Sequence, residues 1–506
     1  MPLLKKGVLI PSDGIDYSKP ATFINDRNGF PINMQFWRSE MRKRDGKSAY
    51  GAAAVADATA IMGFGKLITS AGLQYLVRAS RAKFEQYVVA SNTWADRLAG
   101  FDLTGGVSDF VSMVQATEDD TLIINNGVDN PLKWTGGAVS AATLGGSPPK
   151  AKYACYLSPY LLFANLIDGG DNFPWGVQWN DTGLIETWTG GNSGRAIVGD
   201  EPTPIKNIMK LNEYAAVYKK DSLWLGRKVS TADVFLFDCL KTGIGLSAPR
   251  ALCDVGGIHY FMGQNDFYRW NGGQPESIGL GVRDFIFDSI DRQYIDRCFA
   301  INVSEYNEVW FFTVTSGATW PMDVWKFNYQ LGFWYHDTCT SLTGGIAWNR
   351  TATENWDDEN GSWDEATDTW DSGTVTQEAE ELVLGDSSGY CYKLNRQTTD
   401  DNSIAVLSEF QTKDFSGDQL EVYKRWLQLN LWVRGSGTFK VYYSVDYGSS
   451  WKSISTVTMS DTYTQHRCYF DVVSEVIRFK LVCEGSGNTF YLRNIYPFYM
   501  VREEVR

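Results

Sequence analysis

The sequence predicts an all-β protein, and three features of its 506 residues support this fold class. Aromatic residues make up 14% of the chain, which favours strands over long helices. Glycine is abundant, with 48 residues, as expected where tight turns are frequent. Short apolar stretches flank turns rich in Gly, Asn and Asp, which is typical of hairpins. The length exceeds one ordinary core, so two or three domains are expected.

One hairpin pattern recurs along most of the chain. Its clearest copies span residues 119–137, 212–228, 256–273, 307–328 and 381–395, with weaker copies at 74–88 and 159–179. A further short apolar strand precedes each hairpin, and most neighbouring copies are about 40–50 residues apart, the spacing of four-stranded propeller blades. The pattern therefore predicts a β-propeller of about six to eight blades within residues 56–400, with seven candidate blades between about Thr59 and Asn395. A run of meanders in a sandwich is the alternative.

The first 55 residues differ from this pattern and are interpreted as an extended N-terminal segment. A strand in it is expected to complete the last blade, because the open edges of a propeller have to be closed. The segment contains a basic cluster of Arg38, Arg42, Lys43 and Arg44. This cluster is a possible interaction surface that could contact phosphate. The favoured alternative is a solvated face, or a partner in ion pairs with an acidic insertion elsewhere in the chain.

Such an acidic stretch spans residues 351–380, where Trp356, Trp363 and Trp370 are each followed by Asp. The seven-residue spacing suggests a coiled coil, but only one position in seven is apolar and two glycines oppose a helix. Clustered carboxylates could bind calcium, yet the D-x-D-x-D-G loop pattern is absent. We expect an exposed acidic insertion whose tryptophans attach its turns to the propeller or to a neighbouring subunit.

From residue 401 to 506 the strands become longer and alternate regularly, which predicts a separate antiparallel β-sandwich. Within it, the stretch from 444 to 451 fits the pattern S-x-D-x-G-x-[ST]-W and resembles the Asp-box of sialidases. Its conserved positions correspond here to Ser444, Asp446, Gly448 and Trp451. In such a turn the Asp accepts backbone N–H groups and the Gly takes a positive φ. We expect a structural hairpin from it, and no active site.

Residues that could carry catalysis are few. The only histidines are His259, His336 and His466, each expected to have a packing or surface role. The eight cysteines lack any CxxC pair and are expected to be buried, reduced thiols. The sequence contains no HExxH, GxSxG or Walker phosphate loop. No catalytic, cofactor-binding or metal-binding residue is therefore predicted.

The charge and hydropathy patterns limit the partners. A net charge of −14 argues against a surface that grips phosphates. The N-terminus lacks the apolar run of a signal peptide, and the longest apolar stretch, around Tyr160–Ile167, is too short to span a membrane. We therefore expect a soluble protein that folds in a reducing cytoplasm, without membrane insertion.

Several motifs together resemble a known family. They are G-x-x-x-P-S-x-G-x-D from residue 7, N-M-Q-F-W-R-S-E-x-R-K-R-D-G from 33, D-x-L-I-I-N-N-G-x-D-x-P-L-K-W from 120, and the stretch 256–278 followed by V-R-D-F-I-F. With a terminal sandwich, this order is similar to the tail-hub, or nozzle, proteins of short-tailed double-stranded DNA bacteriophages. The likeness covers most of the chain in layout, and its motifs are moderately specific, since other propellers share them.

The resemblance implies a structural, non-enzymatic virion protein, assembled in the host cytoplasm. Such proteins form a homo-hexameric ring below the portal and adaptor, extend the DNA channel, help to retain and then eject the genome, and carry fibres or a tail tip. Duplex DNA would pass without sequence-specific binding, and we expect net acidic channel loops, because an acidic wall repels phosphates. The alternatives are a carbohydrate-binding or glycan-hydrolysing, sialidase-like propeller and a cellular scaffold propeller.

Overall fold

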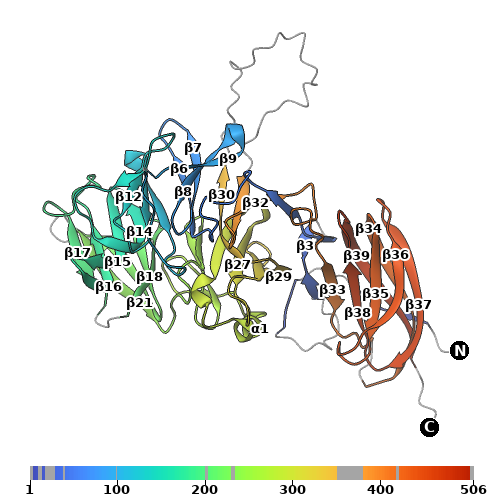
Figure 1. Cartoon of the computed structure of the whole chain (residues 1–506). Coiled ribbons are helices and arrows are strands. Elements are labelled where there is room, and N and C mark those ends of the chain that lie inside the picture. The colour runs from blue at the N-terminus through green and yellow to red at the C-terminus, as the bar shows by residue number, and fades with distance from the viewer. Residues whose placement is uncertain are drawn as a thin grey trace.

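The computed structural model describes residues 4–9, 14–17, 29–37, 40–98, 100–199, 203–229, 234–349, 380–417 and 421–501. Strands dominate these residues (Figure 1). Within them the one α-helix is α1 (Arg283–Ser289). Four separate 3₁₀ turns also occur: η1 (Val89–Ser91), η2 (Thr117–Asp119), η3 (Ile295–Arg297) and η4 (Ser304–Tyr306). The predicted all-β fold class is confirmed.

Most strands belong to four-stranded antiparallel sheets that follow one another along the chain. Five of these sheets are continuous in sequence: β6 (Gly63–Ile68), β7 (Gln74–Ala79), β8 (Phe84–Val88) and β9 (Thr93–Asp96); β10 (Ser112–Ala116), β11 (Thr121–Asn125), β12 (Leu132–Trp134) and β13 (Ala142–Thr143); β14 (Lys150–Leu157), β15 (Tyr160–Asp168), β16 (Asp171–Trp179) and β17 (Gly194–Ile197); β18 (Ile205–Leu211), β19 (Tyr214–Lys219), β20 (Ser222–Lys228) and β21 (Phe235–Thr242); β22 (Leu252–Val255), β23 (Ile258–Met262), β24 (Phe267–Trp270) and β25 (Glu276–Ser277).

Two further groups of four strands depart from this plan. The strands β26 (Phe299–Val303), β27 (Glu308–Thr313), β28 (Asp323–Asn328) and β29 (Phe333–Thr338) form the same meander but belong to a nine-stranded sheet. The strands β30 (Leu342–Asn349), β31 (Glu380–Asp386) and β32 (Cys391–Asn395) take their fourth member, β5 (Gly46–Ala49), from the N-terminal segment.

These sheets are arranged as a ring. The first strand of one sheet contacts the first strand of the next, from β6 to β10, β14 and β18 and from β22 to β26 and β30, and β30 contacts β6. A shared apolar cluster that includes Leu211 and Leu252 connects the sheet of β18 to that of β22. A closed circle of four-stranded meanders is the arrangement of a β-propeller. We call residues 46–395 the ring.

Local sequence explains many of the hairpins in the ring. The turns η1, η2 and η4 end at Asn92, Asp120 and Asn307, whose φ angles of 52°, 46° and 56° are left-handed. Asn and Asp tolerate this conformation because their short polar side chains bond locally. A tight reversal follows, and the next strand starts at once.

The C-terminal module, residues 408–501, contains two sheets. Its strands are β33 (Ser408–Thr412), β34 (Lys424–Gly435), β35 (Thr438–Ser444), β36 (Lys452–Thr458), β37 (Thr464–Ser474), β38 (Arg478–Cys483) and β39 (Phe490–Val501). One sheet has the order β3 (Met34–Trp37), β4 (Glu40–Lys43), β39, β34, β37, with β1 (Lys5–Lys6) beside β39, and the other contains β33-β38-β35-β36. Both sheets contribute to one core, with Trp426 and Leu431 from the first and Phe439 and Leu481 from the second. Alternate residues of each strand therefore face this core.

The N-terminal segment connects the ring to the C-terminal module (Figure 1). Its strand β2 (Gly29–Ile32) pairs with β29 of the ring on one side and with β33 of the module on the other. The strands β3 (Met34–Trp37) and β4 (Glu40–Lys43) form a hairpin whose second strand extends the sheet of β39. The nine-stranded sheet therefore runs from the ring into the C-terminal module through a strand from the opposite end of the sequence.

Candidate functional site

A cluster of buried polar and charged residues lies where this N-terminal segment meets the ring and the module. We call this region the junction: residues 33–47, strands β26–β29, the linker 396–401 and the loop 484–491. Asn33 organises it from a left-handed backbone (φ 56°) with only 3% of its surface exposed. Its Nδ2 donates to Thr338 Oγ1 (2.9 Å) and to the Leu407 carbonyl (2.8 Å). Its Oδ1 accepts the Thr338 N–H at 2.9 Å and Arg44 Nε at 3.0 Å.

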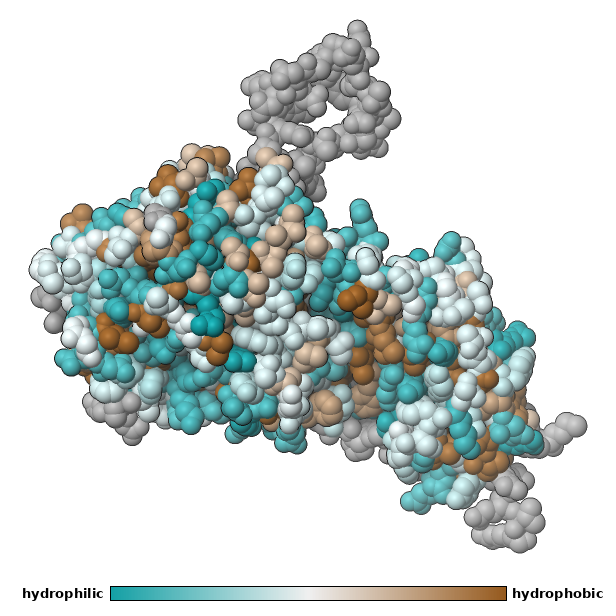
Figure 2. Space-filling model, viewed as in Figure 1, coloured by the Kyte–Doolittle hydropathy of each residue, from teal (hydrophilic) through white to brown (hydrophobic). Residues whose placement is uncertain are grey.

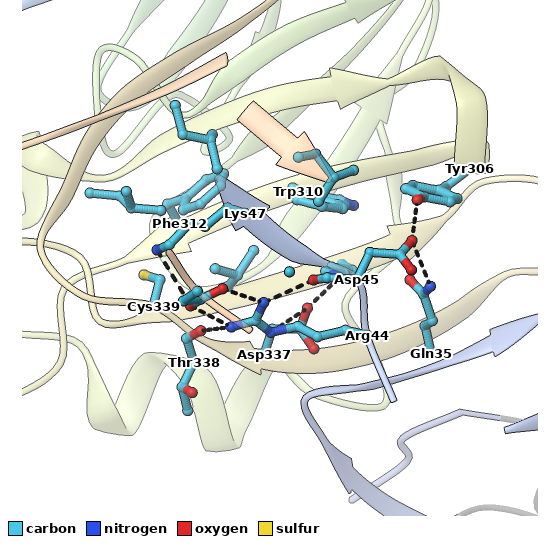
Figure 3. A pocket seen from close by; sticks show the side chains of 17 residues that line it. Gln35, Arg44, Asp45, Lys47, Tyr306, Trp310, Phe312, Asp337, Thr338 and Cys339 are labelled. Atoms are coloured by element: carbon cyan, nitrogen blue, oxygen red, sulfur yellow. Dashed lines mark hydrogen bonds and ion pairs between the residues drawn. The ribbon is translucent and has the colours of Figure 1, made fainter. Parts of the chain in front are cut away.

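Arg44 is the centre of the ion pairs (Figure 3). Its two Nη atoms donate to the two carboxylate oxygens of Asp401 at 2.9 and 2.8 Å, the bidentate geometry in which Arg and carboxylate bind most strongly. Asp337 lies 3.8 Å from Arg44 Nε, and Lys47 Nζ lies 3.5 Å from Asp401. Burial alone would raise the pKa of Asp401, but the hydrogen bonds and charges of Arg44 and Lys47 outweigh it and lower that pKa.

A second buried cation lies next to this pair. Lys326, 2% exposed, forms an ion pair with Asp337, and its Nζ lies 4.1 Å from the centre of the Trp310 ring. Trp310 Nε1 donates to Glu308 at 2.7 Å. Burial raises the pKa of Glu308, and the charge of Lys326 opposes this effect. Charged side chains on one strand are thus balanced by partners on the neighbouring strands.

These groups leave little room for a substrate. They line a cavity of about 40 Å³, close to the ~30 Å³ that one water molecule occupies in the liquid. Tyr306 closes one side, donating its hydroxyl to Asp45 at 2.5 Å, while Asp45 also pairs with Arg42 at 3.0 Å. The carboxylates at the cavity are engaged with cations or hydroxyl groups, so the arrangement suits a structural clamp better than acid–base catalysis.

The predicted basic cluster needs a correction, because its described members point into the junction. Lys43 is 2% exposed and Arg44 is 8% exposed, so neither forms an exposed interaction surface or a solvated face. Arg42 is partly buried against Asp45. Among the described residues, Arg42 pairs with Asp45, and Arg44 pairs with Asp337 and Asp401; none of these carboxylates belongs to the acidic stretch. The fourth member, Arg38, lies outside the described residues.

The acidic insertion at 351–380 falls almost entirely outside the described residues, which resume at Glu380. Trp356, Trp363 and Trp370 are among those outside. Their role as an interaction surface, and the calcium alternative, remain predictions.

The Asp-box forms the turn between β35 and β36. Ser444 Oγ donates to Asp446 Oδ1 at 2.6 Å and accepts the Gly448 N–H at 2.9 Å, and Asp446 Oδ1 accepts the Ser450 N–H at 2.9 Å. These bonds lower the pKa of Asp446 to about 2, the Ser444 hydroxyl having the largest effect. Gly448 has φ 88°. Trp451 lies below Lys480, whose Nζ is 4.5 Å from the ring centre. All four residues therefore take part in turn structure or packing.

The three histidines have packing roles. His259 is fully buried, with Nδ1 2.7 Å from the Tyr218 hydroxyl and Nε2 2.9 Å from the Lys210 carbonyl. His336 lies 2.8 Å from Asp323 and stacks on Trp325, and His466 contacts Thr464.

All eight cysteines are free thiols, and seven are buried. Cys239 is exposed on β21, which corrects the expectation for that residue, because it faces outward on the last strand of its sheet. Among the described residues, no group of three or more His, Cys, Asp and Glu side chains is arranged to hold a metal ion. No helix within the described ranges is long and apolar enough to cross a membrane.

Arg250 marks a second site that the sequence did not suggest. It precedes β22, and its Nη atoms donate to the carbonyls of Thr343 (2.5 Å) and Arg297 (3.2 Å). Its guanidinium lies 3.6 Å from the centre of the Phe110 ring. Burial lowers the pKa of Arg250 to about 9. The Arg250 side chain therefore contacts the segment before β10, the segment before β26, and strand β30. Through these contacts it connects several sheets of the ring.

Comparison with known proteins gave no family model and no curated protein that matches this chain. Among solved structures, the extracellular domain of the putative hybrid two-component system BT4673 from B. thetaiotaomicron is 9% identical, with a TM-score of 0.40 over 69% of this chain and 39% of that one. PorZ of Porphyromonas gingivalis is 10% identical, with a TM-score of 0.38 over 69% of this chain and 38% of that one. The Neurospora crassa Pan2 WD40 domain is 6% identical, with a TM-score of 0.39 over 71% of this chain and 97% of that one. The chain spans about two fifths of the first two proteins. Likenesses at this level carry no functional argument.

Proposed function

We propose that this chain is a structural protein of a phage tail: a tail hub, or nozzle, that extends the DNA channel below the portal and adaptor. One observation supports it most. Strand β2 pairs with both β29 and β33, so one sheet extends from the ring into the C-terminal module. A subunit that must keep its shape in a wall benefits from such continuity, whereas an enzyme needs an accessible site.

The proposal includes the finer architecture. The four-stranded groups from β6 to β32 are seven blades of one propeller, closed by β5, and the C-terminal sheets are a β-sandwich that serves as a platform. The sandwich and the acidic insertion are then the surfaces available for fibres, a tail tip or the adaptor. The intended partners are copies of the same chain, most simply six in a ring, within the virion tail.

The described surface is compatible with assembly between copies. Hydrophobic residues occur in small groups on the ring, separated by hydrophilic ones (Figure 2). On the outer strands, Ile197 of β17 is 51% exposed and Leu236 of β21 is 43% exposed. Contacts between subunits would cover some of these side chains. The charge of −14 per chain would let DNA slide past a wall that repels phosphate, provided that the channel loops are acidic.

The decisive experiment is negative-stain imaging of the purified chain, alone and with a candidate adaptor protein. The proposal expects rings with a central hole wide enough for duplex DNA. We expect the chain to remain monomeric until it meets the adaptor. A protein that stays monomeric with the adaptor would contradict the tail-hub proposal, and stable rings without the adaptor would contradict only the assembly order. A ring lumen rich in lysine and arginine would contradict the sliding argument.

A carbohydrate-binding role is the second candidate, because the C-terminal module exposes several tyrosines. Tyr447 at the Asp-box turn is 61% exposed, Tyr469 is 66% exposed and Tyr423 is 54% exposed. Aromatic rings with a polar edge are suited to contacts that are partly wet. Glycan-array binding by the full chain, lost on Tyr447→Ala and Tyr469→Ala substitution, would favour this candidate.

A further inference from the structure

The ion pair between Lys326 and Asp337 is almost completely enclosed. The two side chains are 2% and 4% exposed, and Nζ of Lys326 contacts the Asp337 carboxylate directly. They lie on the neighbouring strands β28 and β29, where Lys326 is opposite Tyr335 and Asp337 is opposite Val324. Lys326 and Asp337 are therefore diagonal neighbours on one face of the sheet, a separation that a long side chain can span.

The surroundings of this pair hold little water. Trp310 lies directly opposite Lys326 on β27, and its ring centre is 4.1 Å from Nζ. The adjoining cavity, drawn in Figure 3, has a volume of about 40 Å³, close to the ~30 Å³ of one water molecule in the liquid. Charges that are removed from water lose solvation free energy. A neutral amine and a neutral carboxylic acid avoid that cost.

The Asp337 carboxylate is only partly satisfied by its neighbours. Its Oδ2 contacts Lys326 and lies 3.8 Å from Arg44 Nε. Its Oδ1 is buried and has no hydrogen-bond partner among the described residues. A buried acceptor without a partner costs free energy, and a reaction that removes one oxygen from Asp337 would remove this cost.

We propose that Lys326 and Asp337 join through an amide bond, which links β28 covalently to β29. Proton transfer from the ammonium to the carboxylate first gives an amine and a carboxylic acid. The Nζ lone pair then forms a bond to Cγ of Asp337, and the bond from Cγ to the protonated oxygen breaks. That hydroxyl leaves as water after it takes one amine proton. The ion pair is the reactant of this step, and no oxidant, cofactor or external reagent enters it.

The fold supplies what a free amine and a free acid lack. Reacting groups that are held in contact behave as if present at effective concentrations of about 10⁵–10⁸ M. Arg44 lies beside the oxygen that gains negative charge when Nζ attacks, and a fixed cation stabilises such a charge. Glu308 lies on the same face of β27, and the charges of Lys326 and Asp337 act on it. Burial raises the pKa of Glu308, so its carboxyl group can relay protons between amine and acid.

Such a bond would reinforce the strand that carries the junction. Strand β29 pairs with β28 on one side and with β2 on the other. A covalent bond between β28 and β29 closes a loop from residue 326 to 337 that persists in the unfolded chain, which favours the folded state. This inference does not depend on the tail-hub proposal, because it concerns a bond within one chain.

The test is mass spectrometry of the full chain, purified in its folded form and then unfolded in denaturant. We expect an intact mass that is lower than the mass of the sequence by one water molecule, because a covalent bond survives unfolding and an ion pair does not. An intact mass equal to that of the sequence would overturn the proposal.

Digestion with trypsin locates the bond. Trypsin cleaves after an unmodified lysine, so a free Lys326 gives the separate peptides 298–326 and 327–350. An amide at Nζ blocks this cleavage, and we expect one peptide that spans 298–350 and lacks one water molecule. Two separate peptides would show that any water was lost elsewhere in the chain, and would also overturn the proposal.

The variant that tests the assignment is Lys326→Met, which keeps the length of the side chain and removes the attacking nitrogen. We expect it to have its full sequence mass. The matched control is Lys393→Met, because Lys393 forms a more exposed pair with Glu381 at 3.2 Å, and this variant should lack one water molecule as the unmodified chain does. Water loss that persists in Lys326→Met would contradict the assignment. Should that variant not fold, the peptide map of the unmodified chain decides the question by itself.

Discussion

The ring and the junction are stabilised in opposite ways. In the ring, aromatic residues pack between neighbouring sheets: Trp134 makes edge contacts with Tyr75 and Phe84 of the preceding sheet at 5.6 and 5.7 Å. In the junction, charged residues pair across great sequence distances, as Arg44 does with Asp401, 357 positions away. Apolar packing tolerates many sequences, whereas a buried ion pair fails when one partner is removed. The comparison predicts different responses to substitution.

The largest effect is expected in the ring. Trp134 is 1% exposed, and Trp134→Ala would leave a cavity between two sheets, with an expected loss of about 4 kcal/mol in the free energy of unfolding. Denaturant unfolding followed by tryptophan fluorescence and far-UV circular dichroism measures the loss. A loss below about 1 kcal/mol would mean that the sheets do not depend on this packing.

At the junction, Arg44→Met should cost about 3 kcal/mol, because Asp401 and Asp337 lose a partner in a buried site. The effect stays at the low end of the expected range because Lys47 remains 3.5 Å from Asp401. The matched control is Arg425→Met, whose pair with Asp471 is exposed and should contribute little to the free energy of unfolding, because water and salt screen it. Equal losses for the two variants, in the same unfolding assay, would remove the distinction between buried and exposed pairs.

A smaller effect is expected at the Asp-box turn. Gly448 has φ 88°, and an added Cβ would lie 2.8 Å from an Nη atom of Arg478, so Gly448→Ala should cost about 2 kcal/mol from backbone strain and displacement of that side chain. Gly256→Ala in the β22–β23 turn is the control, because its φ is 59° and nothing lies within 4 Å of the added Cβ. It should show only the strain of about 1 kcal/mol. The thermal midpoints of both variants measure the difference.

The stability of the junction should depend on pH through Asp401. The pKa of Asp401 is lowered from its ordinary 3.8, so between the two values the unfolded chain binds more protons than the folded one. Its contribution to stability is present above about pH 4 and is lost as the pH falls through the folded-state pKa. Melting temperature against pH should therefore fall less steeply below pH 4 for Asp401→Asn than for the unmodified chain. Parallel curves would show that Asp401 contributes nothing in this range.

Several features could be predicted from the sequence because they depend on neighbours in the chain. Hairpins such as β11–β12 and β23–β24 follow from alternating apolar residues around turn-forming Asn, Gly and Asp, and the Asp-box turn follows from its own eight residues. The burial of Lys43 and Arg44 could not be predicted, because a run of basic residues usually faces solvent. The sequence did contain one signal for the buried ion pairs of the junction. Lys326 lies between Trp325 and Phe327 in a strand that is mostly apolar, which indicates a charge with a buried partner.

The sequence by itself determined the strand-rich class, the repeated hairpin spacing and the turn chemistry, because these depend on contacts within a few tens of residues. Tertiary structure alone decided that β2 joins the ring to the C-terminal module, that Arg44 meets Asp401, and that Arg250 bridges several sheets. Each of these pairings closes a long loop or buries a charge. Their stability comes from partners that no local pattern specifies, and only the folded chain brings those partners together.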